Sequence, residues 1–218
     1  MYKLKSMFYV TSLFGLLIFM PAAFASMVPA SGHLNFDVMR KGDKIGSQSI
    51  VFGRKDGALN VNIKTRIAVK VLFVTVYRYE ADIRETWRGG KLVSMQAATN
   101  DDGTKHQLTV ISDGKGHLNI NGDGKRRSLP DTYIPASLWN SSYITSGKLM
   151  SGKNGAPLKV KVKLIGKERI KSQGRTIEAK HYAMTGDFAN EVWYDSNKVL
   201  VQQKFKGSDG SIATYVLK

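Results

Sequence analysis

The chain has 218 residues, of which 33 are Lys or Arg and 17 are Asp or Glu, so its formal net charge is +16. Charged residues make up 23% of the chain and apolar residues 42%, which is typical of a globular protein and not of a disordered one. The length suits one domain or two small ones. Because the sequence contains no cysteine, it excludes disulfides, thiolate zinc sites, iron–sulfur clusters and cysteine nucleophiles.

Residues 1–25 have the layout of a secretory signal peptide. Lys3 and Lys5 precede an apolar stretch that a proline ends, and two alanines follow at the positions that a signal peptidase reads. The apolar stretch is shorter than the roughly 18 residues that a membrane-spanning helix needs, and an uncleaved anchor is the alternative. We therefore expect cleavage after Ala25, one β domain over residues 26–218, a periplasmic location and no transmembrane segment in the mature chain.

Alternation of apolar and polar residues predicts β-strands through the rest of the chain. The longest alternating run covers residues 59–70, where mostly apolar side chains lie on one face and Asn, Lys and Arg on the other. Shorter runs cover 33–40 and 158–164, and 199–201 and 212–217 are further strand candidates. Such strands, with one apolar and one polar face, are typical of an antiparallel sheet.

Turn signals separate these strands at the spacing of hairpins, because Gly, Asn and Asp tolerate positive φ angles. They lie at 40–43, 55–57, 88–90, 100–103, 113–116, 121–124, 195–197 and 208–210. The pattern predicts an all-β fold: a single curved antiparallel sheet, either a half-barrel or a barrel-like meander, with one long irregular connection. That connection covers residues 124–155, and we expect it to fold over the sheet and to contain one helical turn at 135–140.

One segment, residues 69–76, departs from the alternation because both of its faces are apolar. The pattern predicts a strand whose second face is covered by the connection that carries Trp139, by another strand, or by a bound apolar ligand. A ligand would be held on a concave surface with aromatic residues at its rim. The candidate ligand-binding residues are Leu72, Phe73, Val74, Val76, Tyr77, Tyr79, Trp87, Trp139 and Trp193. Taken singly, each aromatic residue is typical of a hydrophobic core.

Basic residues are concentrated between positions 148 and 180. Strand alternation places Lys159, Lys161 and Lys163 on one exposed face. Such a stripe is typical of a solvated sheet edge that resists aggregation, or of a surface for lipid headgroups and other anionic material. The candidate anion-binding residues are Lys159, Lys161, Lys163, Lys167, Arg169 and Lys171. Nucleic acid would suit the charge, but no nucleic-acid motif accompanies it, and we expect no such partner.

Motifs for catalysis and metal binding are sparse. None of His33, His106, His117 and His181 has metal-ligand spacing to another histidine. The sequence has no nucleophile elbow, P-loop or dinucleotide-binding glycine motif. The acidic residues nearest to aromatic ones are Asp82, Glu85, Asp187, Glu191 and Asp195. We expect no catalytic residues, metal or cofactor, and the alternative is an enzyme with a pair of titrating groups near Trp193.

Four short strings accompany the opening strand FDVMR and Gly46: TNDDG at 99–103, PASLWN at 135–140, TGDF at 185–188 and VWYD at 192–195. Together they resemble an uncharacterised family of exported bacterial β proteins of about this size. The resemblance covers nearly the whole mature chain and implies no activity. The layout is also distantly similar to the half-barrel of periplasmic lipoprotein carriers, in which a curved antiparallel sheet holds acyl chains. This chain departs from those carriers because it lacks helices that plug the concave side.

These observations predict an exported, non-enzymatic binding protein of the bacterial envelope that holds a lipid-like or apolar ligand on a concave sheet. The alternative is an envelope structural or interaction protein that binds anionic polymer or a protein partner through its basic face.

Overall fold

The computed structural model describes residues 27–207 and 209–218, which form one sheet of 15 strands. Its first part contains β1 (His33–Arg40), β2 (Asp43–Lys55), β3 (Ala58–Val71), β4 (Val74–Arg88), β5 (Lys91–Asp101), β6 (Thr104–Ser112), β7 (His117–Gly122) and β8 (Lys125–Pro130). Its second part contains β9 (Ile134–Pro135), the short helix α1 (Tyr143–Ser146), β10 (Lys148–Met150), β11 (Pro157–Ser172), β12 (Arg175–Gly186), β13 (Asn190–Tyr194), β14 (Leu200–Lys206) and β15 (Ile212–Leu217).

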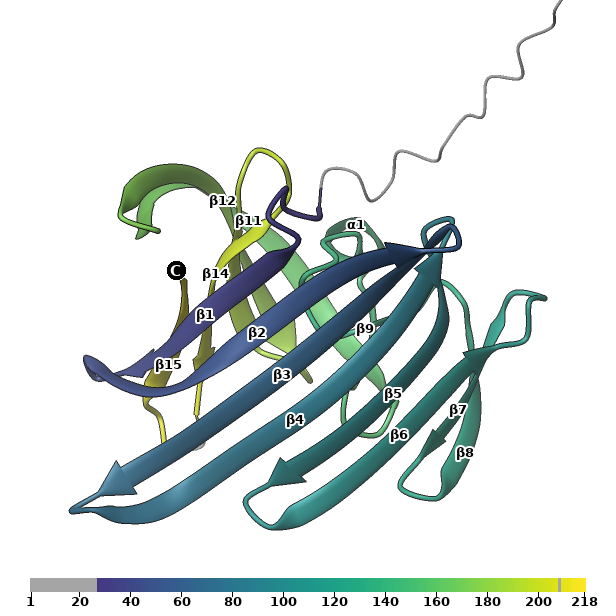
Figure 1. Cartoon of the computed structure of the whole chain (residues 1–218), viewed down its shortest axis with the longest axis horizontal. Coiled ribbons are helices and arrows are strands. Elements are labelled where there is room, and N and C mark those ends of the chain that lie inside the picture. Colours follow the sequence, from purple (N-terminus) through teal and green to yellow (C-terminus); the bar gives the residue numbers. More distant parts are fainter. Residues whose placement is uncertain (1–26, 208) are drawn as a thin grey trace, which may run out of the picture.

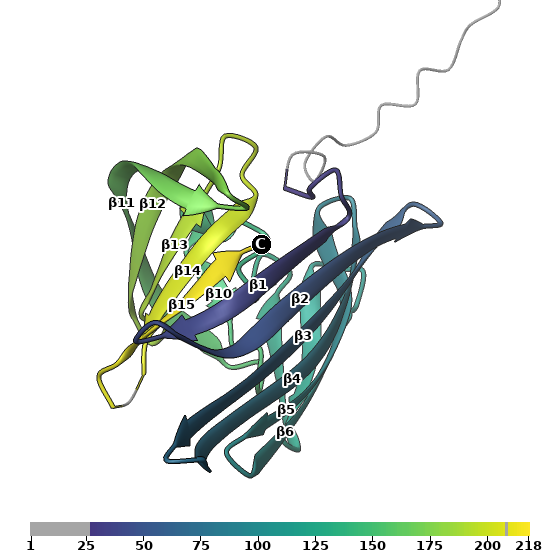
Figure 2. The ribbon, with the colours of Figure 1, turned by 60° about the vertical axis from the view of Figure 1, so that its left-hand side comes forward.

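The sheet is a meander folded back on itself. Its strand order runs from β8 to β1 and then from β15 to β9, so the first and last strands lie side by side at its centre. Figures 1 and 2 show the two resulting curved wings, which we call the N-terminal wing (β1–β8) and the C-terminal wing (β11–β15). The all-β fold with one curved sheet is confirmed, with β9 and β10 as a parallel pair in an otherwise antiparallel order. Because β8 and β9 end the order, the sheet is open.

The connection between the wings is the segment between β8 and β11, and it fills the space between them. The irregular connection expected at residues 124–155 therefore begins later, because residues 125–130 form β8. Figure 1 shows α1 and β9 of this connection between the two wings. Its apolar side chains Leu138, Trp139, Tyr143, Leu149 and Met150 are all buried in the common core. The helical turn expected at residues 135–140 is wrong, because Pro135 is part of a strand and Leu138 has a φ of 64°, outside the helical range.

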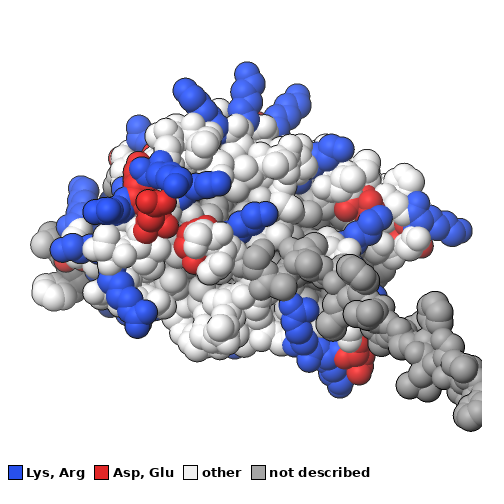
Figure 3. All heavy atoms as spheres, turned by 90° about the horizontal axis from the view of Figure 1, so that it is seen from above, with Lys and Arg blue, Asp and Glu red and all other residues white. Residues whose placement is uncertain are grey.

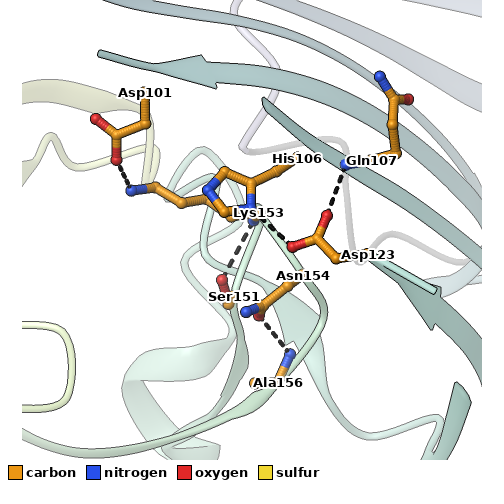
Figure 4. A network of polar contacts seen from close by, with 8 residues as sticks. All are labelled: Asp101, His106, Gln107, Asp123, Ser151, Lys153, Asn154 and Ala156. Atoms are coloured by element: carbon orange, nitrogen blue, oxygen red, sulfur yellow. Dashed lines mark hydrogen bonds and ion pairs between the residues drawn. The ribbon is translucent and has the colours of Figure 1, made fainter. Parts of the chain in front are cut away.

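The turn before β11 attaches the connection closely to the N-terminal wing. A Cβ atom on Gly122 would lie 2.1 Å from the carbonyl oxygen of Asn154. A Cβ atom on Gly155 would lie 2.4 Å from Cγ2 of Ile120. Lys153 also forms an ion pair with Asp101 at the end of β5 (Figure 4). Backbone packing and an ion pair therefore hold this end of the molecule, where the two edge strands do not pair.

The signal peptide and its cleavage after Ala25 lie outside the described residues. Among the residues that are described, no helix is long and apolar enough to cross a membrane.

Candidate functional site

The turn between β3 and β4 exposes large apolar side chains to water. Leu72 is 87% exposed and Phe73 is 99% exposed. Val71, Val74 and Val76 beside them are each more than half exposed, and we call these five residues the apolar tip. The single strand predicted over residues 69–76 is wrong, because the chain reverses at Leu72 and Phe73. The residues that were predicted to form two apolar faces of one strand instead form the end of one hairpin.

The turn adopts a conformation that side chains with a Cβ atom avoid. Leu72 has a φ of 47° and Phe73 a φ of 70°, both in the left-handed region. Every other consecutive pair of positive φ angles in the described chain ends in glycine: Lys41-Gly42, Asp56-Gly57, Gly89-Gly90, Asp102-Gly103, Asp123-Gly124 and Gln173-Gly174. The left-handed conformation costs a non-glycine residue about 1–2 kcal/mol. The Leu72-Phe73 turn therefore combines backbone strain with the exposure of two large apolar groups.

The β3–β4 hairpin also projects beyond its neighbours in the sheet. The pairing of β2 with β3 ends at Ile67, and the pairing of β5 with β4 ends at Tyr79. Residues 68–78 consequently form a ribbon that pairs with no further strand of the described chain, and it extends past the β1–β2 turn at the lower left of Figure 1. The apolar tip is the far end of this ribbon.

The base of the ribbon is anchored by a polar network. The hydroxyl of Tyr77 donates to Oδ1 of Asp101 over 2.8 Å, and Lys153 pairs with the other carboxylate oxygen. The Nζ atom of Lys153 also lies 5.7 Å from the centre of the Tyr79 ring. Burial opposes the ionisation of Asp101, but the hydrogen bonds from Lys153 and Tyr77 outweigh this effect. The pKa of Asp101 is therefore below its usual value. Burial and the nearby carboxylate raise the pKa of Tyr77.

Two of the predicted ligand-binding tryptophans lie in the core. The indole N–H groups of Trp87 and Trp139 each donate to Oε2 of Glu85 over 2.9 Å. The rings of Trp87 and Trp139 meet edge to face with centres 5.5 Å apart, and Phe52 contacts Trp139 from another side. Burial raises the pKa of Glu85, and the indole hydrogen bonds oppose that effect. The connection, through Trp139, therefore occupies the inner face of the N-terminal wing.

The third tryptophan, Trp193, belongs to a separate cluster in the C-terminal wing. His181 stacks on Trp193 with ring centres 4.0 Å apart. Its Nδ1 atom lies 2.8 Å from Glu168 and its Nε2 atom 2.9 Å from Glu191. The indole N–H of Trp193 donates to Glu168 over 2.8 Å, and Nζ of Lys204 lies 5.0 Å from the Trp193 ring. The bonds from Trp193 and then His181 lower the pKa of Glu168.

Glu168 and His181 were not predicted as members of one cluster, because only the pairing of β11, β12 and β13 brings them together. No sequence spacing signals that contact. The nine predicted ligand-binding residues thus lie in separate places. Leu72, Phe73, Val74 and Val76 lie at the apolar tip with Tyr77 and Tyr79 at its base, Trp87 and Trp139 lie in the core, and Trp193 lies in the C-terminal cluster.

The predicted basic stripe is divided by a β-bulge. Lys163 lies opposite Ala183, but after the bulge between Leu164 and Gly166, Lys167 lies opposite Lys180. One extra residue turns the following side chains to the other face of the strand. The six predicted residues therefore form two exposed groups on opposite faces: Lys159, Lys161 and Lys163, and then Lys167, Arg169 and Lys171. Lys and Arg side chains also project widely over the surface seen in Figure 3.

Within the described ranges, no group of three or more His, Asp or Glu side chains is placed to hold a metal ion. Two surface depressions contain no residue of the apolar tip or of the Trp193 cluster. One is lined by side chains of β6, β7 and β8, and the other lies beside the C-terminal Lys218 and β1.

Comparisons with known proteins support the fold and supply a family. No curated protein matches the chain. A solved beta-barrel-like protein of domain of unknown function DUF1849 from Brucella abortus is 8% identical, with a TM-score of 0.58 over 84% of this chain and 94% of that chain. A DUF1089 family protein from Pseudomonas aeruginosa is 12% identical, with a TM-score of only 0.39 over 71% of this chain and 87% of that one. The family model of DUF6134, a domain of unknown function, matches residues 36–218. The chain belongs to the DUF6134 family.

Proposed function

We propose that this protein is a non-enzymatic binding protein of the bacterial envelope that contacts a lipid-like or other apolar partner through its apolar tip. The observation that carries the proposal is the exposure of Leu72 and Phe73 in a turn with two consecutive positive φ angles, where every other such pair in the described chain ends in glycine. The envelope location rests on the signal-peptide layout of residues 1–25.

The energetics of the tip favour a bound state. Burying one large apolar side chain contributes about 1.5–3 kcal/mol. Leu72 and Phe73 receive almost none of this stabilisation in the free chain, because both are nearly fully exposed. A partner that covers both would therefore gain several kcal/mol before the costs of association.

The packing of the connection also favours the tip over a ligand held on the concave face. Trp139 is completely buried against the inner face of the sheet, and its indole N–H is hydrogen-bonded to Glu85. An acyl chain on that face would have to displace this side chain and remove one of the two indole donors of the buried Glu85 carboxylate. Contact at the projecting tip requires no such rearrangement.

The Trp193 cluster supports a binding role over a catalytic one. Both ring nitrogens of His181 already have carboxylate partners in Glu168 and Glu191. His181 is 8% exposed and Trp193 is 1% exposed, which leaves little of either side chain open to a substrate. This arrangement is typical of a structural hydrogen-bond cluster.

Retention on dodecylphosphocholine micelles tests the proposal. We expect the wild-type protein to co-elute with micelles, and Leu72→Asp and Phe73→Asp to lose retention. Ile111→Asp is the matched control, because Ile111 is 55% exposed on β6 away from the tip. Equal retention of a folded Phe73→Asp variant, judged by circular dichroism, would contradict the assignment of the tip.

A second function is favoured by the lysines on β11. Lys159, Lys161 and Lys163 are exposed on one face, and none of their ammonium groups forms an ion pair among the described residues. Lys148 of β10 lies directly opposite Lys159, which adds like charge to the same place. We propose that this face contacts an anionic polymer.

The bulge in β11 supplies a matched control for this second function. Replacing Lys159, Lys161 and Lys163 with glutamine should weaken binding to dextran sulfate and reduce its salt dependence. Replacing Lys167, Arg169 and Lys171 removes the same charge from the opposite face and should leave binding closer to wild type. Equal losses in both triple variants would indicate attraction by net charge alone.

A further inference from the structure

We infer that the apolar tip is a membrane wedge: the end of the β3–β4 ribbon enters one leaflet of an anionic lipid bilayer while the sheet stays at the surface. This inference rests on the proposed function, in which the same tip contacts an apolar partner, and it specifies that partner.

The shape of the site excludes a small enclosed ligand. The ribbon projects beyond its neighbours, because β2 and β5 stop pairing with it at Ile67 and Tyr79. No strand of the described chain is therefore paired beside residues 71–74 to surround a single acyl chain. The partner must itself provide an apolar layer that is thick enough to cover the tip, as the hydrocarbon core of a bilayer does.

The order of side chains along the ribbon matches the layers of a membrane surface. Residues 71–74 at the end are all apolar. Lys70, opposite Thr75, is the first charged side chain behind them, and Tyr77 and Arg78 follow. Lys70 lies on the second rung behind the turn. Two rungs of about 3.3 Å correspond to the roughly 5–10 Å to which interfacial segments are buried. Lysine, arginine and tyrosine are the side chains that meet headgroups at this level.

The charge at the same end of the N-terminal wing favours an anionic surface. Because the strands alternate in direction, the β1–β2, β5–β6 and β7–β8 turns lie at the same rim as the apolar tip (Figure 1). Exposed lysines accompany these turns: Lys41, Lys105 and Lys125. Of the four carboxylates in these turns, Asp101 and Asp123 are engaged by Lys153 and His106 (Figure 4), while Asp43 and Asp102 are exposed. The whole chain carries a formal net charge of +16.

The anchored base gives the wedge a fixed direction. Tyr77 and Lys153 both hold Asp101, and Lys153 comes from the connection on the inner side of the wing. These contacts tie the ribbon to β5 and to the connection, just behind the apolar residues. The tip is presented at the rim before any partner arrives.

A tryptophan placed at the tip provides a direct test. The three native tryptophans are at most 1% exposed, so acyl-chain quenchers in a vesicle do not reach them. In a full-chain Phe73→Trp variant, we expect a blue shift and strong quenching on vesicles of phosphatidylcholine with phosphatidylglycerol whose acyl chains are brominated. Ile111→Trp is the control and should stay unquenched. Leu72→Asn combined with Phe73→Gly keeps the turn and should reduce vesicle binding at least tenfold.

The outcomes separate this inference from the proposed function. Binding of the wild type to micelles without binding to vesicles would overturn the membrane wedge and leave the proposed apolar contact intact. Vesicle binding without quenching of Phe73→Trp would also overturn it, since adsorption by charge alone is then sufficient. Absence of binding to both micelles and vesicles would overturn the wedge and the proposed function together.

Discussion

Trp139 in the connection donates its indole N–H to the buried carboxylate of Glu85 on β4 over 2.9 Å, across 54 residues of sequence. The bond is one of two that Oε2 of Glu85 accepts, the other coming from Trp87. A fully buried acceptor between two indole donors ties the irregular connection to the sheet. The fold is therefore held together at its centre by a polar contact inside an aromatic cluster.

Trp139→Ala should destabilise the protein by about 3–5 kcal/mol, because it leaves a large cavity in the core. It also removes one hydrogen bond from Glu85. Urea unfolding followed by circular dichroism measures the change. Ile111→Ala on the exposed face of β6 is the comparison and should change stability far less. Similar losses for both variants would mean that the connection does not stabilise the sheet.

Glu85→Gln should change how stability depends on pH. Since the folded-state pKa of Glu85 is raised, its carboxyl group stabilises the fold below its unfolded pKa, and this stability is lost as pH rises through the folded pKa. Glutamine does not ionise and its oxygen still accepts indole hydrogen bonds. The stability of the variant relative to wild type should therefore increase from pH 4 to neutral pH. A constant difference in thermal unfolding over that range would contradict a raised pKa.

Gly122→Ala should destabilise the protein, because the new Cβ atom would lie 2.1 Å from the carbonyl oxygen of Asn154 and force the turn before β11 away from β7. Gly53→Ala on β2 is a matched control, since no atom lies within 4 Å of the added Cβ there. We expect a loss of about 1–3 kcal/mol for the first variant and little change for the second, measured by urea unfolding. Faster hydrogen exchange in residues 151–156 of Gly122→Ala would locate the effect.

Replacing Leu72 with Asn and Phe73 with Gly should raise the free energy of unfolding by about 1–2 kcal/mol. Asn-Gly is the preferred sequence for a turn with two positive φ angles, so the exchange removes the strain of the present turn. Thermal unfolding gives the measurement. A variant that is more stable and no longer binds micelles would show that the native turn lowers the stability of the fold and is required for micelle binding. A less stable variant would show that Leu72 and Phe73 contribute to the fold.

Local patterns predicted the strands well. The alternation predicted strands at 33–40 and 212–217 with the bounds of β1 and β15. Turns with Gly, Asn or Asp were also located, because their residues tolerate positive φ. The Leu72-Phe73 turn was missed, since neither residue carries a turn signal and the surrounding valines favour a continuous strand. Leu72, Phe73, Val74 and Val76 of the apolar tip were among the candidate ligand-binding residues, but they were expected on a concave surface and lie at a projecting end.

The sequence by itself determined the all-β class, the alternating strands and the irregular connection, because each depends on residues close together in the chain. Only the tertiary structure decided that β1 pairs with β15, that Glu85 joins Trp87 to Trp139, and that Glu168 meets His181. Those contacts depend on strand register and on packing across long loops, which local periodicity does not encode. The same holds for the apolar tip, which is exposed because the strands beside β3 and β4 end before it does.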